Sequence, residues 1–227
     1  MQATITDIIN ETPSVRRFFL QTGDLTVFDF KPGQFVTLKL PDATERSYSI
    51  ASLNGGNNAF ELCIVLNPEG KATPVLWQMK PGDTLEFDGP LGQFILHEPA
   101  PCDYAFVCTG TGVAPFRPMI QELLKSGVQR QIYLIFGGRN QVDLLYRKEF
   151  EAWQEQYPGF HYIPVLSREL WEGRKGYVHA IYEELFADGR DARFYVCGWQ
   201  AMCKEARMRL KQLGYNRRQY FFEEYDG

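Results

Sequence analysis

The chain has 227 residues, a length that fits one large domain or two small ones and allows a sizeable buried core. Hydrophobic residues make up 44% of it and charged residues 23%, which excludes an intrinsically disordered protein. A net charge of −4 argues against a nucleic-acid-binding protein, and no apolar stretch reaches the roughly 18 residues of a membrane-spanning helix.

Residues 1–99 are typical of a β domain. Short β-rich runs alternate with turn signals such as Pro32-Gly33 and Pro81-Gly82-Asp83, and few helical patterns interrupt them. The candidate strands are residues 34–40, 46–52, 60–65 and 84–87. This pattern predicts a closed barrel or a sandwich of strands, followed by a stiff linker at 98–101.

Residues 100–227 alternate between apolar runs and amphipathic stretches. The candidate strands are residues 104–108, 131–136, 161–166, 193–197 and 220–224. The candidate helices are residues 115–125, 146–156, 178–186 and 200–213, several of them followed by a glycine (Gly127, Gly189, Gly214) of the kind that ends helices. We therefore predict an α/β domain with a parallel sheet of five strands and helices on both faces.

A glycine-rich turn, Thr109-Gly110-Thr111-Gly112, directly follows the first strand of this second domain. Such a turn lets the backbone approach a pyrophosphate, and N–H groups at the start of the next helix face the anion. Pro115 fits the first turn of that helix, although it stands where a dinucleotide fingerprint has its third glycine. An ordinary strand-to-helix turn is the alternative, but the position favours phosphate binding.

Two segments of the first domain have the residues for binding an anionic aromatic ligand. On the strand at 46–52, Arg46 and Tyr48 share one face, where a guanidinium would bind a diphosphate and a ring would lie on a flat ligand. The turn Gly70-Lys71-Ala72-Thr73 begins a short predicted helix with free N–H groups and a hydroxyl. A barrel strand with an exposed arginine and a simple capped helix are the alternatives.

The sequence shows no metal-binding pattern. The five cysteines (Cys63, Cys102, Cys108, Cys197, Cys203) include no C-x-x-C pair, and the three histidines are scattered. We therefore expect no disulfide framework, no metal and no iron–sulfur centre on this chain, so that any such centre belongs to a partner. With no signal-peptide pattern at the N-terminus, we expect a cytoplasmic protein that does not insert into membranes.

Six motifs together resemble the ferredoxin–NADP reductase family, in the same order along essentially the whole chain. They are Arg46-x-Tyr48-Ser49, Gly70-x-x-Thr73, Gly89-Pro90-Leu91-Gly92-Gln93-Phe94, Gly110-Thr111-Gly112-Val113-Ala114-Pro115-Phe116, Asp143-Leu144-Leu145-Tyr146 and Cys197-Gly198-x-x-x-Met202. The resemblance implies a short member of this family without an iron–sulfur domain. It further implies an antiparallel, Greek-key, FAD-binding β-barrel at 1–99 and a Rossmann-like NAD(P)-binding α/β domain at 100–227.

The resemblance also implies roles for individual residues. Ser49, Cys197, Glu223 and Tyr225 would be catalytic, with Ser49 near flavin N5, Cys197 against the nicotinamide and Tyr225 beside the flavin until the nicotinamide displaces it. The FAD contacts would be Arg46, Tyr48, Ser49, Cys63, Val65, Gly70, Lys71, Ala72 and Thr73. The contacts of the nicotinamide dinucleotide would be Thr109, Gly110, Thr111, Gly112, Ser167, Arg168, Lys175, Tyr177, Cys197, Gly198 and Met202.

The choice between NADPH and NADH depends on residues 167–178. Ser167, Arg168, Lys175 and Tyr177 resemble the cluster that binds the 2′-phosphate in NADPH-using members. NADH-using oxygenase reductases share the Ser-Arg pair and a Trp-x-Gly-x-x-Gly-x-Val segment like that at 171–178. We favour NADPH and keep NADH open. Trp199 is bulkier than the residue that the family pattern has after Cys197-Gly198, so nicotinamide docking can differ here.

The function that the resemblance implies is transfer of a hydride from NAD(P)H to FAD, followed by delivery of electrons to a one-electron carrier such as ferredoxin or flavodoxin. Two alternatives within the family are a reductase that releases reduced free flavin and the reductase component of an oxygenase. A non-catalytic flavin-binding module is a third alternative, and the intact motifs argue against it.

Overall fold

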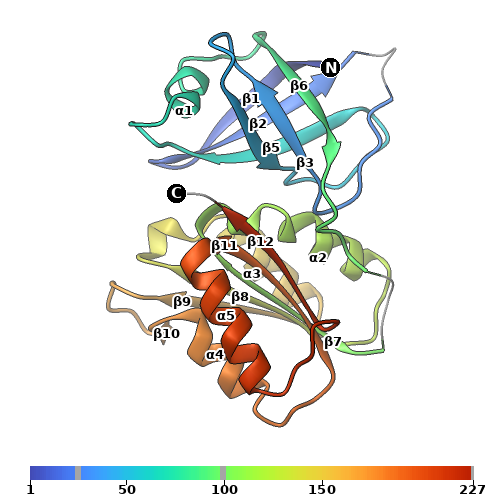
Figure 1. Ribbon diagram of the computed structural model, residues 1–227, viewed down its shortest axis with the longest axis vertical. Coiled ribbons are helices and arrows are strands. Elements are labelled where there is room, and N and C mark those ends of the chain that lie inside the picture. Colours follow the sequence, from blue (N-terminus) through green and yellow to red (C-terminus); the bar gives the residue numbers. More distant parts are fainter. Residues whose placement is uncertain (24–26, 98–100, 226–227) are drawn as a thin grey trace. The chain divides into compact units, whose positions relative to one another are not determined.

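A computed structural model of the protein describes residues 1–23, 27–97 and 101–225. Contacts divide these residues into two compact units (Figure 1), which we call unit 1 and unit 2. Unit 1 comprises Met1–Leu96 and Ala114–Lys125, and unit 2 comprises His97–Val113 and Ser126–Gly227. The domain boundary predicted between residues 99 and 100 lies outside the described residues, as does most of the predicted linker at 98–101, so both stay predictions.

Unit 1 is built on one antiparallel sheet in the order β4-β3-β6-β1-β2-β5. Its elements are β1 (Gln2–Thr12), β2 (Val15–Thr22), β3 (Phe35–Lys39), β4 (Glu45–Ser49), β5 (Ala59–Val65), α1 (Ala72–Leu76) and β6 (Thr84–Leu91). The two end strands of this order meet just beyond β4, where Ile50 bridges to Leu62 of β5 and the Ala51 N–H donates to the Glu61 carbonyl at 2.8 Å. The sheet is therefore the closed antiparallel barrel that the sequence predicts.

Alternating apolar residues of these strands fill the barrel. Phe28, which precedes β3, lies at the centre of an aromatic group, with ring centroids 5.2, 4.8 and 5.4 Å from those of Phe30, Phe60 and Phe87. These four rings are at most 3% exposed and belong to one buried cluster with residues of all the strands except β4. Burial of apolar area on this scale is the main force that holds the barrel closed.

Unit 2 is built on one parallel sheet in the order β10-β9-β8-β7-β11-β12. Its strands are β7 (Asp103–Thr109), β8 (Ile132–Gly138), β9 (Phe160–Leu166), β10 (Arg174–Lys175), β11 (Ala192–Trp199) and β12 (Tyr220–Tyr225). The five predicted strands are all present. The predicted count of five is one short because β10 adds a sixth strand of two residues, too short to leave a periodic signal.

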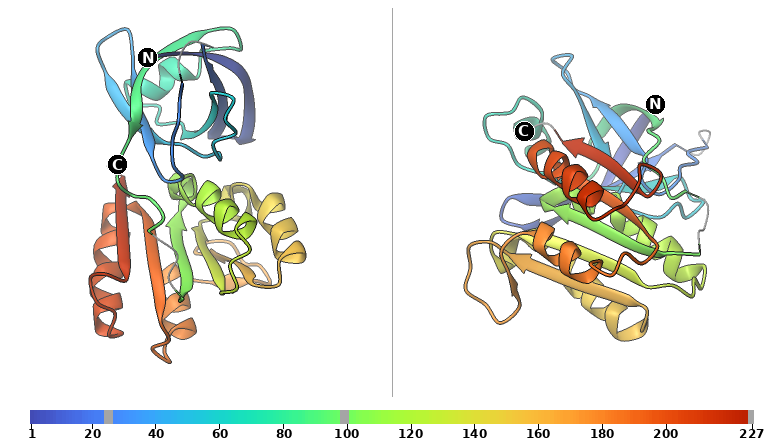
Figure 2. Two further views of the ribbon diagram at one scale, coloured as in Figure 1. Left: turned by 90° about the vertical axis from the view of Figure 1, so that its right-hand side faces the viewer. Right: turned by 60° about the horizontal axis from the view of Figure 1, so that its bottom comes forward.

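Helices cover both faces of this parallel sheet (Figures 1 and 2), as predicted. The helices of unit 2 are α3 (Arg147–Gln156), α4 (Val178–Leu185) and α5 (Gln200–Gln212), and α3 lies on the face opposite to α4 and α5. Gly214 ends α5 at a φ of +94°, with the Tyr215 N–H donating to the Leu210 carbonyl at 3.0 Å, which is the hydrogen-bond pattern of a glycine helix cap. Among the described residues, no helix is both long and apolar enough to cross a bilayer.

The segment after β7 differs from the prediction in one respect. The glycine-rich turn forms a 3₁₀ turn at Gly110–Val113, and α2 (Phe116–Lys125) begins only afterwards, so that Pro115 precedes the helix instead of lying in its first turn. Contacts assign α2 to unit 1, where the Phe116 ring lies 5.9 Å from that of Phe94. The N–H groups nearest the glycines therefore belong to the 3₁₀ turn.

A charged network joins α4 to α5 in unit 2. His179 Nδ1 lies 2.8 Å from the Tyr182 hydroxyl, and its Nε2 lies 3.4 Å from Glu205. Arg209 binds the carboxylates of both Glu183 and Glu205. Burial lowers the pKa of His179 below its usual 6.5, although the Glu205 charge opposes this effect. The folded protein therefore resists protonation of His179 more than the unfolded chain does.

We predict that this histidine makes the protein less stable in acid. Below about pH 6.5 the unfolded chain binds a proton that folded His179 resists, so the free energy of unfolding falls as the pH falls. His179→Gln should make the dependence shallower, which urea unfolding between neutral pH and about pH 5 would measure. Equal slopes for the two proteins would contradict the prediction.

Candidate functional site

Strand β4 carries three of the predicted flavin contacts. Arg46 is exposed, and its Nη1 donates to the Glu45 carbonyl at 2.7 Å. Tyr48 is half-buried against the barrel core, and burial raises its pKa to about 12 against the opposing charge of Arg46. Ser49 is buried at 6% exposure. This strand thus presents an exposed guanidinium beside a phenol that stays neutral at physiological pH.

Strand β5 carries two further predicted contacts, Cys63 and Val65. Phe60, Leu62 and Ile64 of this strand point into the barrel core, so the alternate positions face away from it. Cys63 is buried at 4% exposure, whereas Val65 is 45% exposed. Only Val65 therefore offers open apolar surface at this end of β5.

The turn before α1 holds its threonine tightly. The Thr73 hydroxyl donates to the Asn67 carbonyl and accepts from the Asn67 N–H, both at 2.8 Å, and the Gly70 N–H donates to the same carbonyl at 3.0 Å. The hydroxyl proton of Thr73 is thus already used to shape the turn. The Ala72 side chain lies in the barrel core, while Lys71 is exposed. Backbone N–H groups and the Lys71 ammonium are therefore the groups that this turn offers to a phosphate.

The two glycines of the turn after β7 serve different purposes. A Cβ on Gly112 would lie 2.3 Å from the Cys197 carbonyl oxygen, so only glycine allows the turn to pack against β11. Gly110 has a φ of +54°, and a Cβ there would meet nothing within 4 Å. Gly110 thus supplies a left-handed backbone next to open space, whereas Gly112 supplies close packing within the protein.

Thr109, at the end of β7, has an unusual hydroxyl. Its Oγ1 is buried and has no hydrogen-bond partner among the described residues. A Cβ on Gly198 would lie 2.6 Å from this oxygen, so the hydroxyl lies against the glycine that follows Cys197. An unsatisfied buried hydroxyl costs free energy that a ligand with a hydrogen-bonding group would recover. The turn at 109–112 therefore fits a polar ligand such as a dinucleotide.

Three of the four predicted catalytic residues come together at the carboxyl ends of β11 and β12. Parallel pairing sets Cys197 beside Glu223 and Trp199 beside Tyr225, and the Cys197 thiol lies 3.9 Å from a Glu223 carboxylate oxygen. Complete burial raises the pKa of Cys197 well above its usual value, and the Glu223 charge adds to this effect. The thiol is therefore neutral and donates to the carboxylate.

Met202 and Trp199 border this group. The methyl carbon of Met202 would lie 2.8 Å from a Cβ on Gly198, so Met202 packs directly on the backbone after Cys197. Trp199 is 58% exposed. Ser49, the fourth predicted catalytic residue, belongs to unit 1.

The predicted 2′-phosphate residues lie after β9. Backbone hydrogen bonds from Ser167 to the Gly138 carbonyl and from Arg168 to the Arg139 carbonyl fasten this segment to the end of β8. Arg168 and Lys175 are exposed, and Tyr177 is 73% exposed. These side chains are thus available at the surface near the carboxyl ends of β8 and β9.

Arg139, which was not among the predicted site residues, follows β8 and is exposed beside Arg168. Arg174, in contrast, is bound by both carboxylate oxygens of Glu184 at 2.7 Å. A signal for Arg139 exists in the sequence, because it follows Gly137-Gly138 at the carboxyl end of a predicted parallel strand, where ligands of α/β domains bind.

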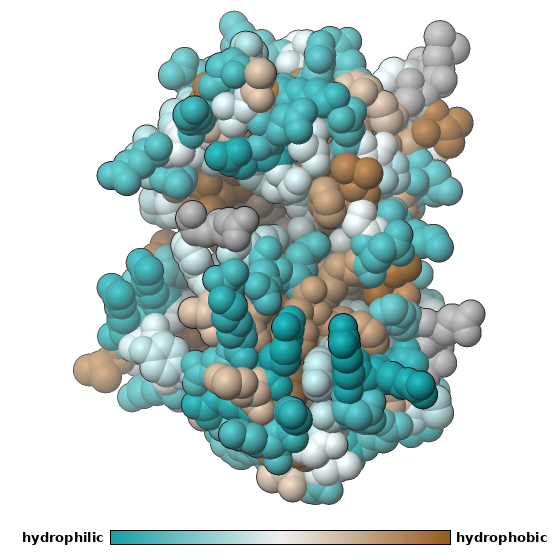
Figure 3. Space-filling model, viewed as in Figure 1, coloured by the Kyte–Doolittle hydropathy of each residue, from teal (hydrophilic) through white to brown (hydrophobic). Residues whose placement is uncertain are grey.

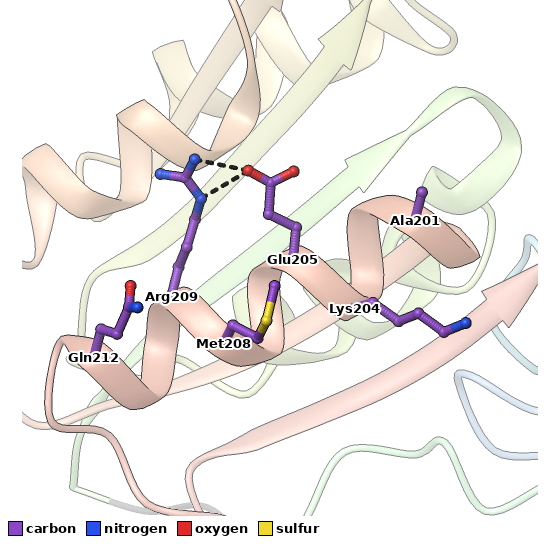
Figure 4. Close-up of a pocket in the computed structure, with 6 residues that line it drawn as sticks. All are labelled: Ala201, Lys204, Glu205, Met208, Arg209 and Gln212. Atoms are coloured by element: carbon purple, nitrogen blue, oxygen red, sulfur yellow. Dashed lines mark hydrogen bonds and ion pairs between the residues drawn. The ribbon is translucent and has the colours of Figure 1, made fainter.

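None of the predicted site residues lines either of two surface hollows. One, of about 490 Å³, runs along the exposed face of α5 (Figure 4), a largely hydrophilic face in Figure 3, and the ion pair of Glu205 and Arg209 crosses it. The other is lined by His97, Phe221 and three arginines (Arg193, Arg217 and Arg218). Within the described ranges, no three His, Cys, Asp or Glu side chains are grouped to bind a metal ion, and none of the five cysteines is in a disulfide.

We predict that the two glycines of the turn respond differently to replacement by alanine. Gly110→Ala should cost about 1 kcal/mol, the strain of a left-handed alanine in open space. Gly112→Ala should cost about 3 kcal/mol, because its methyl group overlaps the Cys197 carbonyl. Urea unfolding of both variants beside the wild type would measure the difference. Equal losses would show that the turn does not depend on this close approach.

Comparison with known families assigns both parts of the chain. Residues 2–95 match the oxidoreductase FAD-binding domain, and residues 106–208 match the oxidoreductase NAD-binding domain. A cytochrome P450 reductase from Amycolatopsis has a similar structure, with a TM-score of 0.92 and 28% identity over 99% of this chain and 69% of the other. The predicted antiparallel and parallel α/β architectures are thereby confirmed.

Among curated proteins, ferredoxin–NADP reductase B of Sorangium cellulosum is 35% identical, over 95% of this chain and 93% of that protein. The reductase component of phenol 2-monooxygenase from a Pseudomonas species is 31% identical over 99% of this chain. The chain spans only 65% of that component and 50–61% of the next three relatives. This chain therefore belongs to the ferredoxin–NADP reductase family of FAD- and NAD(P)-binding oxidoreductases.

Proposed function

We propose that this protein takes electrons from NADPH onto a bound FAD and passes them to a separate one-electron carrier of the ferredoxin or flavodoxin type. The observation that carries the proposal is the convergence of Cys197, Glu223 and Tyr225 at the end of the parallel sheet, where the turn at 109–112 also packs. Similarity to a ferredoxin–NADP reductase along nearly the whole chain supports it.

The barrel residues would bind and orient the FAD. Arg46 would bind the diphosphate through charge-assisted hydrogen bonds, and the neutral ring of Tyr48 would pack on the flat ring system. Ser49 and Val65 would contact the flavin from β4 and β5, and the N–H groups before α1 would add phosphate contacts. When bound, FAD supplies the chemistry, because it accepts a hydride from a nicotinamide and releases electrons singly.

The residues of unit 2 would hold the dinucleotide and exclude water from its reactive end. The turn at 109–112 would bind the pyrophosphate through its backbone, and the Thr109 hydroxyl would gain the partner that it lacks. The neutral Cys197 thiol would give a small, dry surface for the nicotinamide while its proton stays on the sulfur, shared with Glu223. The exposed ring of Trp199 would border the same place.

NADPH is favoured over NADH because of two neighbouring arginines. Arg139 and Arg168 are exposed at the ends of β8 and β9, joined through their backbones, and Lys175 is exposed nearby in sequence. A 2′-phosphate requires such cations. The five cysteines, none of which is in a disulfide, also support a reducing compartment such as the cytoplasm.

A role as the reductase component of an oxygenase is the second candidate. Several relatives are reductase or electron-transfer components of oxygenases that act on phenol, anthranilate or toluate. The electron acceptor in that case would be an iron–sulfur centre or an oxygenase component. A reductase that releases free flavin stays the alternative to both.

Reduction of the purified protein tests the proposal. After incubation with FAD and gel filtration, we expect stoichiometric flavin in the protein peak, because the barrel offers both a guanidinium and a ring to it. Under anaerobic conditions NADPH should bleach the yellow absorbance, and a ferredoxin or flavodoxin should restore it. Flavin that leaves the protein on gel filtration yet still supports turnover would favour a free-flavin reductase. Persistent yellow colour with both NADPH and NADH would indicate a non-catalytic module.

We predict that Arg168→Ala raises the KM for NADPH about tenfold and leaves the KM for NADH within about twofold, because only NADPH carries the phosphate that the guanidinium binds. Steady-state assays with each nucleotide and a fixed acceptor would measure this. Arg139→Ala should have the same selective effect. Arg174→Ala is the matched control, because Glu184 already binds that arginine. Equal changes in the KM values for the two nucleotides would contradict the proposed role of Arg168 in binding the 2′-phosphate.

A further inference from the structure

Unit 1 contains a buried ion cluster that the proposed function does not use. The Glu61 carboxylate accepts hydrogen bonds from Arg17 at 2.7 and 3.0 Å and from Arg117 at 3.1 Å, and Arg17 also lies 3.4 Å from Glu11. The Glu61 side chain is 4% exposed, and those of Arg117 and Arg17 are 12% and 18% exposed. Two acids and two bases thus share one largely dry site.

The cluster lies where two proposed flavin-binding strands meet. Glu61 is on β5, on the face that points away from the barrel core and that it shares with Cys63 and Val65. Ile50, the residue after Ser49 of β4, bridges to Leu62, next to Glu61. The cluster therefore sits at the junction between the strand of Tyr48 and Ser49 and the strand of Val65.

Hydrogen bonds from the cluster hold the segment that follows β4. Arg117 Nη1 donates to the Ala51 carbonyl at 2.6 Å, and the Ala51 N–H donates to the Glu61 carbonyl at 2.8 Å. The Glu61 N–H donates to the Ser52 hydroxyl at 3.0 Å. Both backbone groups of Ala51, two residues after Ser49, are thus fixed by Glu61 or by its partner.

Arg117 is itself held in place. It lies at the start of α2, whose Phe116 is fully buried and packs on Phe94 of unit 1. Its guanidinium therefore reaches the Ala51 carbonyl and the Glu61 carboxylate from a packed helix, so the position of the segment is defined from outside the barrel sheet.

Stability alone is a poor reason for such a cluster. Removing charges from water is costly, and well-packed apolar residues often stabilise a protein as well as a buried ion pair does. Directional hydrogen bonds to one backbone segment, in contrast, set its position more sharply than apolar packing, because charge-assisted bonds demand short distances and defined angles.

We propose that Arg17, Glu61 and Arg117 are positioning residues for the flavin, which fix the junction of β4 and β5 and thereby the spacing of Tyr48 and Ser49 from Val65. The inference rests on the proposed function, because it takes Tyr48, Ser49 and Val65 as flavin contacts. None of the three cluster residues needs to touch the flavin; they act through the backbone at Ala51 and Ser52.

The experiment compares FAD binding by Arg117→Met, Arg117→Lys and the wild type. Each apoprotein is titrated with FAD, and the visible circular dichroism and fluorescence of the bound flavin are recorded at saturation. Arg117→Met loses the bonds to Ala51 and Glu61, so we expect FAD to bind about tenfold more weakly and the bound flavin to have a changed circular dichroism spectrum. Arg117→Lys, which keeps a cationic donor, should restore most of both.

Two further variants keep the outcome clear. Arg209→Met is the matched control, because Arg209 also binds two carboxylates but belongs to unit 2; it should lower the melting temperature and leave the flavin spectrum and affinity unchanged. If Arg117→Met does not fold, the double variant Glu61→Gln with Arg117→Met takes its place. It removes the carboxylate charge that would otherwise lose a partner, while Arg17 keeps Glu11.

The results separate the two proposals. A wild-type protein that binds no FAD overturns the proposed function and this inference together. A wild type that binds FAD, beside a folded Arg117→Met or double variant with unchanged affinity and an unchanged flavin spectrum, overturns this inference alone. A lowered melting temperature without a flavin effect also counts against it, because that is the result of a merely structural ion cluster.

Discussion

The backbone of Gly112 lies so close to the carbonyl group of Cys197 that no side chain fits between them. This contact joins the turn after β7 to the end of β11, and it places the buried hydroxyl of Thr109 against Gly198. Parallel pairing then brings Glu223 of β12 beside Cys197. The proposed dinucleotide site thus depends on one glycine whose missing side chain allows this close packing.

The barrel has a comparable constraint of a different kind. It closes where Ile50 bridges to Leu62 and the Ala51 N–H donates to the Glu61 carbonyl, and charged hydrogen bonds of the Glu61 side chain lie beside this junction. Close backbone packing fixes one half of the molecule, and a buried ion cluster fixes the other. In both, contacts within the protein set the geometry of the proposed binding residues.

Much of the fold could be predicted because apolar residues recur along the chain at the regular spacing of a helix or a strand. The four long helices begin and end within one residue of their predicted limits, and all five substantial parallel strands are present. Strands β1 and β2 were not predicted. Register shifts between Ile5 and Asp7 and between Asn10 and Thr12 break the alternation of β1, and paired arginines and phenylalanines mask that of β2. Strand β10 has two residues, too few to show an alternation of apolar and polar positions.

Short motifs identified the family, the FAD-binding barrel and the NAD-binding domain, because glycines, an Arg-x-Tyr-Ser strand and a Cys-Gly pair are local features. Contacts that form only when the chain folds leave no such local pattern. The bonds of Thr73 to Asn67, the place of Arg139 beside Arg168, and the cluster of Glu61 with Arg17 and Arg117 became visible only in the folded chain. The sequence by itself determines which charged groups the protein has. Which of them form ion pairs was decided by the tertiary structure, because the packing of strands and helices brings residues together that are apart in the sequence.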